Sequence, residues 1–445
     1  MAIHEPLSRR SFLKRSAAVG GGLVVGFLVP SGLRRLAAQA PPAPAGLPPA
    51  NAFLRIGSDE SVTVLLAHSE MGQGIWTTLP MLVNEELDAD WKRFRVEHAP
   101  AAPAYRHTAF PVQMTGGSTT TWSEFERYRQ VGAVARTLLV QAAATQWGVA
   151  PSACHTEKGY VVSGVKRASY GSLADAAAQL PQPKEVALKP PGEWKVIGKP
   201  TRRLDTPQKI TGKAQFGIDV QLPGLLTAVV AHSPTFGGKV KRFDAAAAKA
   251  VPGVRAVVEI PTGVAVVGDH FWAAKVGRDA LEIEWDAGPH GDVDTDVLRA
   301  AFRLKAKTEG PVAKTAGDAA AALQAGTPIV AEYTAPFLAH APMEPLNCTV
   351  RKSPGRCEIW TGTQFQTGDQ GRAAQILGLK PEQVELHTTF LGGGFGRRAN
   401  ATSDFVSEAV EIAKRIDQPV KMVWTREDDI RGGYYRPISV HRLEA

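Results

Sequence analysis

The stretch Leu391–Arg398, Leu-Gly-Gly-Gly-Phe-Gly-Arg-Arg, decides how the rest of this chain is interpreted. It follows a strand-like run, Val384–Phe390, and its glycines permit backbone angles and close approaches that other residues avoid. Such a loop can turn its N–H groups toward an anion, and the two arginines add positive charge. The stretch therefore predicts a site for a phosphate-bearing or otherwise anionic cofactor. The alternative is an ordinary glycine-rich turn with solvated arginines.

The spacing of this loop excludes two nucleotide-binding motifs. A Rossmann fingerprint needs Gly-x-Gly-x-x-Gly, and Arg397 stands where the third glycine belongs. A P-loop needs Gly-x-x-x-x-Gly-Lys followed by Ser or Thr, and the sequence contains no such run. A nicotinamide dehydrogenase is therefore excluded, and other segments must identify the ligand.

The composition is that of a globular protein with room for several domains. The 445 residues are 44% hydrophobic and 21% charged. The net charge of +8 is concentrated in the first forty residues, so nucleic-acid binding is not expected. Cys154, Cys348 and Cys357 form no Cys-x-x-Cys pair, so we expect no iron–sulfur cluster and no zinc site in the chain. Cys348 and Cys357 flank a turn and either face each other in a disulfide or, as we favour, remain reduced in the core.

The N-terminal segment has the layout of an export signal. Ser8–Lys14 pairs two arginines with Phe-Leu-Lys, and an apolar run, Ala17–Leu33, follows. Ala38-Gln39-Ala40 is a small-x-small cleavage pattern, and a proline-rich spacer follows it. The pattern predicts twin-arginine export to the periplasm or to the periplasmic side of the inner membrane. A membrane anchor is the alternative, which the short, glycine-rich apolar run disfavours.

Beyond the spacer, alternating strand and helix patterns predict an α+β fold. We expect helices over Thr77–Leu87 and Ser123–Trp147, and Gly148 should end the second of them. The alanine-rich segment 297–326 is expected to be helical or partly mobile. Strands are expected within 52–66 and at 225–231, 254–260, 264–267, 281–285, 329–334, 347–351 and 357–361.

Three further segments carry residue types suited to ligand binding. Glu70–Gly74, Glu-Met-Gly-Gln-Gly, lies between a predicted strand and a helix, so Gln73 either presents its amide to a bound group or belongs to a tight turn. Glu344 lies among proline and hydrophobic residues in His340–Pro345, where a carboxylate with a raised pKa suits catalysis, although most buried carboxylates are structural. Gln364 follows a predicted strand, where polar side chains are well placed to contact a ligand.

Together these segments resemble the molybdenum-binding large subunit of the xanthine oxidase / aldehyde oxidoreductase family. The resemblance rests on Glu70–Gly74, His340–Pro345, Trp360–Gln364, Leu391–Arg398 and Trp424–Asp429. Lys209–Pro234 is similar to the opening of that family's α/β hammerhead domain. Here the Met-Gly-Gln-Gly segment precedes the Gly-Gly-Gly-Phe-Gly segment. This permuted order and the twin-arginine signal resemble the isoquinoline 1-oxidoreductase β-subunit branch.

The resemblance implies a molybdopterin-binding domain of the xanthine oxidase family combined with an α/β hammerhead domain, in permuted motif order. The expected divisions are a signal peptide (1–40), a spacer (41–50), the Met-Gly-Gln-Gly part of the molybdopterin-binding domain (51–180), a linker (181–208), the hammerhead domain with its connector (209–326) and the incomplete Gly-Gly-Gly-Phe-Gly part (327–445).

The resemblance also implies a function: the catalytic subunit of an exported molybdenum hydroxylase that oxidises an N-heterocyclic aromatic compound or an aldehyde with oxygen from water. Its cofactor would be molybdopterin cytosine dinucleotide. Electrons would pass to a separate small two-cluster iron–sulfur subunit, and a cytochrome c is a candidate acceptor.

The same resemblance assigns roles to individual residues. Gln73 would act in catalysis by hydrogen bonding to an oxo ligand of molybdenum. Glu344 and Gln364 would lie in the substrate pocket, and no side chain is expected to ligate a metal. The cofactor would contact Gly72, Gln73, Gly74, Gly116, Gly117, Ser118, Gly393, Gly394, Phe395, Gly396 and Arg397.

The sequence departs from the family pattern in one respect. The family's catalytic glutamate lies in a C-terminal Gly-Val-Gly-Glu type motif, and the sequence contains no such motif. We therefore expect a C-terminally truncated fragment, or a subunit that another chain completes, and no activity from this chain alone. A non-catalytic exported binding or scaffold protein that keeps the fold is the alternative.

Overall fold

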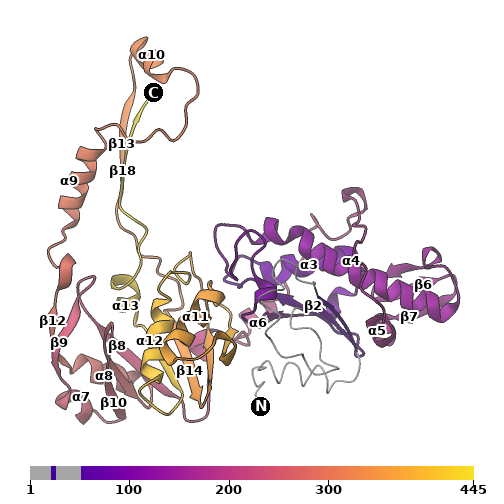
Figure 1. Ribbon diagram of the computed structural model, residues 1–445, viewed down its shortest axis with the longest axis horizontal. Coiled ribbons are helices and arrows are strands. Elements are labelled where there is room, and N and C mark those ends of the chain that lie inside the picture. Colours follow the sequence, from indigo (N-terminus) through magenta and orange to yellow (C-terminus); the bar gives the residue numbers. More distant parts are fainter. Residues whose placement is uncertain (1–21, 27–51) are drawn as a thin grey trace. The chain divides into compact units, whose positions relative to one another are not determined.

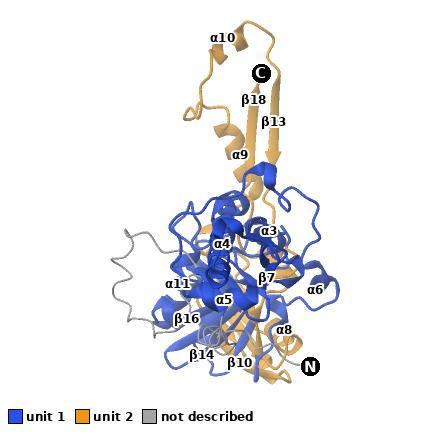
Figure 2. Cartoon of the chain, turned by 90° about the vertical axis from the view of Figure 1, so that its right-hand side faces the viewer, with its two compact units in different colours: residues 1–225, 347–421 blue, residues 226–346, 422–445 orange. Residues whose placement is uncertain are grey.

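The computed structural model describes residues 22–26 and 52–445, and the chain divides into two compact units (Figures 1 and 2). The first unit combines Met1–Leu225 with Asn347–Lys421, and the second combines Leu226–Leu346 with Met422–Ala445. Both units mix helices and strands, which confirms the predicted α+β class. Within the described residues, no helix is both long and apolar enough to cross a bilayer.

The N-terminal part of the first unit packs a mixed sheet against helices. The strand order is β1-β2-β3-β4, with bounds Gly22–Gly26, Ala52–Gly57, Val62–Leu66 and Phe94–His98. Helices α3 (Ile75–Leu87) and α4 (Thr120–Trp147) confirm the two predicted helices, and Gly148 ends α4 with φ 66°. β1 contains five residues of the predicted apolar signal region, whereas the twin-arginine motif lies outside the described residues.

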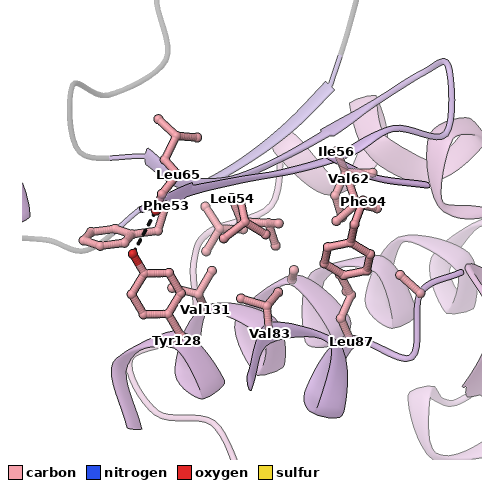
Figure 3. Packing of buried hydrophobic residues seen from close by; sticks show 14 of the residues in the cluster. Phe53, Leu54, Ile56, Val62, Leu65, Val83, Leu87, Phe94, Tyr128 and Val131 are labelled. Atoms are coloured by element: carbon pink, nitrogen blue, oxygen red, sulfur yellow. Dashed lines mark hydrogen bonds between the residues drawn. The ribbon is translucent and has the colours of Figure 1, made fainter. Parts of the chain in front are cut away.

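Side chains from this sheet and these helices form one hydrophobic core (Figure 3). Leu54 of β2 and Val83 of α3 are fully buried in it, and each such side chain contributes roughly 1.5–3 kcal/mol. The Tyr128 hydroxyl of α4 donates to the Leu65 carbonyl at 2.8 Å and accepts from the Ala67 N–H at 3.0 Å. These bonds satisfy a buried phenol and fix the end of β3, where the candidate site begins.

A small sheet and two short helices complete this part of the chain. Strands β5, β6 and β7 form a three-stranded antiparallel sheet. The strand bounds are His155–Glu157 (β5), Tyr160–Ser163 (β6) and Lys166–Ser169 (β7). The helices are α5 (Tyr170–Ala178) and α6 (Thr206–Ile210).

The C-terminal part of the first unit is a β-hairpin followed by a β-α-β unit. Strands β14 (Asn347–Ser353) and β15 (Arg356–Thr361) are antiparallel, and helix α11 (Gln366–Leu377) connects β15 to the parallel strand β16 (Val384–Thr388). Helix α12 (Asp404–Ala413) packs against β14 and α11. The predicted strands at 347–351 and 357–361 are confirmed.

The two cysteines of the hairpin are both buried and both free, as favoured from the sequence. The alternative, in which the two cysteines face each other in a disulfide, does not hold, because Cys357 lies opposite Lys352 in the hairpin register. Burial raises the pKa of the Cys357 thiol to about 12, so this cysteine is an inert core residue.

The second unit contains an antiparallel set of strands in the order β10-β11-β8, with helices α7 and α8 packed against it. Two antiparallel pairs, β9 with β12 and β13 with β18, accompany it, and α9 packs beside β18 (Figure 1). The strand bounds are Leu226–His232 (β8), Lys239–Asp244 (β9), Val254–Ile260 (β10), Gly263–Gly268 (β11), Glu282–Asp286 (β12), Val330–Ala335 (β13) and Ser439–Glu444 (β18). The helix bounds are Ala246–Ala250 (α7), Phe271–Asp279 (α8), Thr295–Lys305 (α9), Ala319–Gln324 (α10) and Arg426–Arg431 (α13). The predicted strands of this region are confirmed, and β17 (Val420–Val423) lies where the chain passes from the first unit to the second.

Candidate active site

Loops of the first unit that are far apart in sequence are joined by hydrogen bonds between buried groups. The Ser69 N–H donates to Thr115 Oγ1 at 2.8 Å, and the Ser69 hydroxyl donates to the Thr363 carbonyl at 2.6 Å. The Thr115 N–H donates to the Gln364 carbonyl at 2.8 Å, and the Gln364 amide donates to the Thr115 carbonyl at 2.9 Å. The loops after β3, before α4 and after β15 therefore form one assembly.

The glycine-rich loop joins this assembly by close packing. The Leu391 N–H donates to the Glu70 carbonyl at 3.1 Å. A Cβ on Gly394 would lie 2.5 Å from Gln364 Oε1 and 3.1 Å from Met71 Sδ, so only glycine lets the three segments meet. The structure thus brings together three of the segments singled out from the sequence.

The backbone of this loop takes an unusual course. Gly393, Phe395 and Gly396 have φ values of 96°, 55° and 93°, and the Arg397 N–H donates to the Gly394 carbonyl at 2.9 Å. A left-handed conformation costs a non-glycine residue such as Phe395 about 1–2 kcal/mol, so the surrounding contacts must hold the turn. The phenyl ring of Phe395 is 73% exposed and extends from the loop.

The guanidinium groups of the two loop arginines are buried and paired within the protein, so the alternative of solvated arginines does not hold. Arg397 is 3% exposed and forms a bidentate pair with Asp404, at 2.6 and 3.2 Å. Arg398 is 1% exposed and donates to the carbonyls of Gly393 at 2.9 Å and Gly362 at 3.2 Å. Both guanidinium groups brace the loop from within, because planar donor groups can satisfy several buried acceptors at once.

Gln73 has an amide that is held by its own loop. Its Nε2 donates to the Ser69 carbonyl and its Oε1 accepts from the Met71 N–H, both at 2.7 Å. The residue is exposed, and a primary amide carries two N–H donors. The side chain is therefore fixed while one N–H can still be donated to a ligand.

Glu70 is the residue that organises this loop, a role that no pattern in the sequence indicated. Its buried carboxylate accepts the N–H groups of Gly72 at 2.8 Å, Gly74 at 3.3 Å and Trp76 at 3.0 Å. It thereby holds the glycine turn and satisfies N–H groups at the start of α3. A carboxylate used in this way is unsuited to act as a general base.

Two cations from the predicted linker and the segment after it complete the Glu70 cluster. Arg203 donates to the Glu70 carboxylate at 3.1 Å and to the Gly72 carbonyl at 3.0 Å, and Lys209 lies 3.4 Å from the carboxylate. Both also donate to Asp205 at 2.6 Å. Burial alone would raise the pKa of Asp205, but these donors hold it below its ordinary value. The cluster fixes residues 70–74 from the outer side.

The turn at Gly116-Gly117-Ser118 leads into the N-terminus of α4. Gly117 and Ser118 have φ values of 64° and 56°, and Thr119 makes no side-chain cap to the helix. The first N–H groups of this 28-residue helix therefore have no side-chain cap, and the helix dipole favours an anion at this end. A surface hollow of about 570 Å³ lies at the same helix end, lined by Ser118, Thr121, Trp122, Ser123, Phe125 and Glu126.

One buried atom of the assembly points to a ligand. Gln364 is 1% exposed, and its Oε1 has no hydrogen-bond partner among the described residues, although its Nε2 is bonded. A buried acceptor without a partner costs about 1–3 kcal/mol, which a ligand N–H beside Gly394 would recover. These residues therefore fit a cofactor with N–H donors. Glu344, which the sequence placed in the pocket, is buried and belongs to the second unit.

The fold and these loops define a protein built to hold a cofactor in a glycine-lined cradle. Models of the molybdopterin cofactor-binding domain match residues 14–236 and 304–444. The chain belongs to the xanthine oxidase family of molybdenum- and molybdopterin-binding subunits. The predicted fold family is thereby confirmed.

The curated relatives described below are much longer than this chain. It is 33% identical to the isoquinoline 1-oxidoreductase subunit beta of Brevundimonas diminuta, over 99% of this chain and 62% of that protein. It is 32% identical to a membrane-bound aldehyde dehydrogenase (pyrroloquinoline-quinone) of Gluconacetobacter polyoxogenes, over 98% of this chain and 58% of that protein. The crystal structure of quinoline 2-oxidoreductase from Pseudomonas putida 86 superposes with a TM-score of 0.44 and 17% identity, over 55% of this chain and 36% of its own.

Proposed function

We propose that this chain is the cofactor-binding part of a molybdenum hydroxylase that oxidises an N-heterocyclic aromatic compound or an aldehyde, with water as the oxygen source. The observation that carries the proposal is the cradle at Gly394, where Gln364 offers a buried acceptor without a partner. The two substrate classes are those named in the relatives described above.

Each residue of the cradle has a defined task in this proposal. A bound molybdopterin supplies the metal centre for oxygen transfer and for uptake of two electrons. Gln364 Oε1 would accept an N–H of the cofactor, and the remaining N–H of Gln73 would be available to an acceptor on it. The N-terminus of α4, after Gly116-Gly117-Ser118, attracts the phosphates of a cytosine dinucleotide form.

The general base of the reaction is proposed to come from outside these 445 residues. Glu70 is occupied by N–H groups and cations, so it is not available as the base. The chain spans about three fifths of the length of its curated relatives, so a further polypeptide segment, of the same protein or of another, is proposed to supply this carboxylate.

Electron transfer is proposed to use a separate small iron–sulfur subunit, with a cytochrome c as the candidate acceptor. The three cysteines provide no cluster-binding pattern, and the two in the hairpin are buried thiols. Export by the twin-arginine route to the periplasm remains part of the proposal and rests on the Ser8–Lys14 motif.

Cofactor content tests the proposal directly. The chain is produced in cells that synthesise the cytosine dinucleotide cofactor, and bound molybdenum, pterin fluorescence and released CMP are measured. We expect about equimolar molybdenum, and at least tenfold less in Gln364→Leu, in proportion to the loss of a buried acceptor. Gly371→Ala, on α11 with open space around it, is the matched control. A folded wild-type chain without molybdenum would favour the alternative of a non-catalytic binding protein.

A further inference from the structure

A cluster of two carboxylates and an imidazole lies on the β15–β16 sheet, apart from the active-site loops. Glu358 on β15 lies directly opposite Glu385 on the parallel strand β16, and His387 follows two residues later on the same face. One ligand atom from each of the three side chains lies within 4.8 Å of the others. Because neighbouring strands fix all three residues, the arrangement is rigid.

The imidazole of His387 is turned into this cluster without a hydrogen-bond partner. Its Nε2 is buried, has no partner among the described residues, and lies 3.7 Å from Glu385 Oε1, which is too long for a hydrogen bond. The ring stacks on Trp360 with centroids 4.9 Å apart and planes 14° apart, so it cannot turn away easily. Burial, assisted by Arg356 and Arg351, lowers the pKa of His387 to about 4, which leaves the imidazole neutral at neutral pH.

We propose that Glu358, Glu385 and His387 form a binding site for a divalent transition-metal ion, for which Zn²⁺ is the natural probe. A neutral imidazole and two carboxylates are ligands that Zn²⁺ accepts, and three protein ligands leave one position for water. The cation would satisfy the nitrogen that the protein leaves without a partner. The site stabilises the strand pair and takes no part in oxygen transfer.

Arg356 holds the place that the metal would take. Its Nη2 lies 2.5 Å from Glu385 Oε2 and 3.4 Å from Glu358 Oε1, while Arg351 donates to Glu358 Oε2 at 2.8 Å. The Arg356 side chain is 40% exposed and lies directly after the β14–β15 turn, so it can move into solvent when a cation enters. The metal and Arg356 therefore compete for the same carboxylates.

Metal titration of the purified full-length chain tests this site. Zn²⁺ binding is followed by calorimetry, and Co²⁺ substitution by its visible absorption bands. We expect one site per chain in the wild type, weakened at least tenfold in His387→Ala and in Glu385→Gln, and tightened about tenfold in Arg356→Gln. His441→Ala, on the exposed strand β18, is the matched control and should bind as the wild type does.

The variants also separate this proposal from its alternatives. Circular dichroism checks that each variant is folded, and Glu385→Gln preserves shape if His387→Ala disturbs the Trp360 stack. Absence of binding in both wild type and Arg356→Gln would overturn the proposal. So would undiminished binding in both ligand variants, which would place the metal elsewhere. Binding that arises only in Arg356→Gln would show that the arginine is the native partner and would equally overturn it.

Discussion

Gly394→Ala is the sharpest test of the cradle geometry. The new methyl group would lie 2.5 Å from Gln364 Oε1, whereas ordinary contacts begin at about 3.4 Å, so the neighbours must separate by about 1 Å. Gln364 cannot retreat cheaply, because it is buried and its amide is bonded to the Thr115 carbonyl. We expect a destabilisation of about 1–3 kcal/mol, the usual cost of overpacking a rigid site, and a loss of bound cofactor.

Chemical unfolding of the variant, followed by fluorescence and circular dichroism, measures this cost. Gly371→Ala lies in the interior of α11 with nothing near the new methyl group, so it should be neutral or stabilise by about 0.5–1 kcal/mol. Gln364→Ala should relieve the clash, so that the double variant is more stable than additivity predicts, by roughly 1 kcal/mol. If Gly394→Ala unfolds like Gly371→Ala, or if the double variant is strictly additive, the close packing of these loops is refuted.

Three further predictions concern buried charge. Burial raises the pKa of Asp369 from an ordinary 3.8 to about 7, so the folded state binds the proton more tightly than the unfolded state does. The free energy of unfolding should therefore fall as pH rises from 4 to 7. Asp369→Asn should remove this pH dependence in unfolding curves. Burial lowers the pKa of His98 from 6.5 to about 4, so the folded state disfavours the proton. The free energy of unfolding should therefore fall by up to roughly 3 kcal/mol as pH drops from 6.5 to 4. His98→Gln should abolish this loss. Glu124 is fully buried against Arg127 and His68, so Glu124→Gln should destabilise by about 3–5 kcal/mol in denaturant titrations, and a cost below 1 kcal/mol would contradict this pairing.

Local patterns in the sequence predicted the elements well. The helix Thr120–Trp147 and its end at Gly148 follow from helical periodicity and a left-handed glycine, both of which depend on neighbouring residues alone. The strands of the hairpin at 347–361 were likewise evident. Their register was not: Cys357 lies opposite Lys352, four residues from Cys348, and the residue pattern of the two strands does not set that pairing.

The site could be predicted only in part, because local sequence patterns do not show which distant residues pair with one another. Glycines and a glutamine at strand-to-helix junctions marked the loops, since such residues are needed wherever a backbone must approach a ligand. The partners of the charged groups were not marked. Arg397 pairs with Asp404, and Glu70 pairs with Arg203, which lies 133 residues away. Only the folded chain brings such groups together, so the sequence could not show that the arginines brace the loop.

The hydrogen bonds between the loops also bear on when the cofactor can enter. Ser69 and Thr363 are 294 residues apart, and Thr115 and Gln364 are 249 apart, yet each pair is bonded inside the cradle. Because a site joined by such distant contacts has no counterpart in the unfolded chain, the cofactor binds only a chain in which these loops have come together. An export route that carries folded proteins is therefore the one under which the proposed periplasmic enzyme would receive its cofactor in the cytoplasm, before it crosses the membrane.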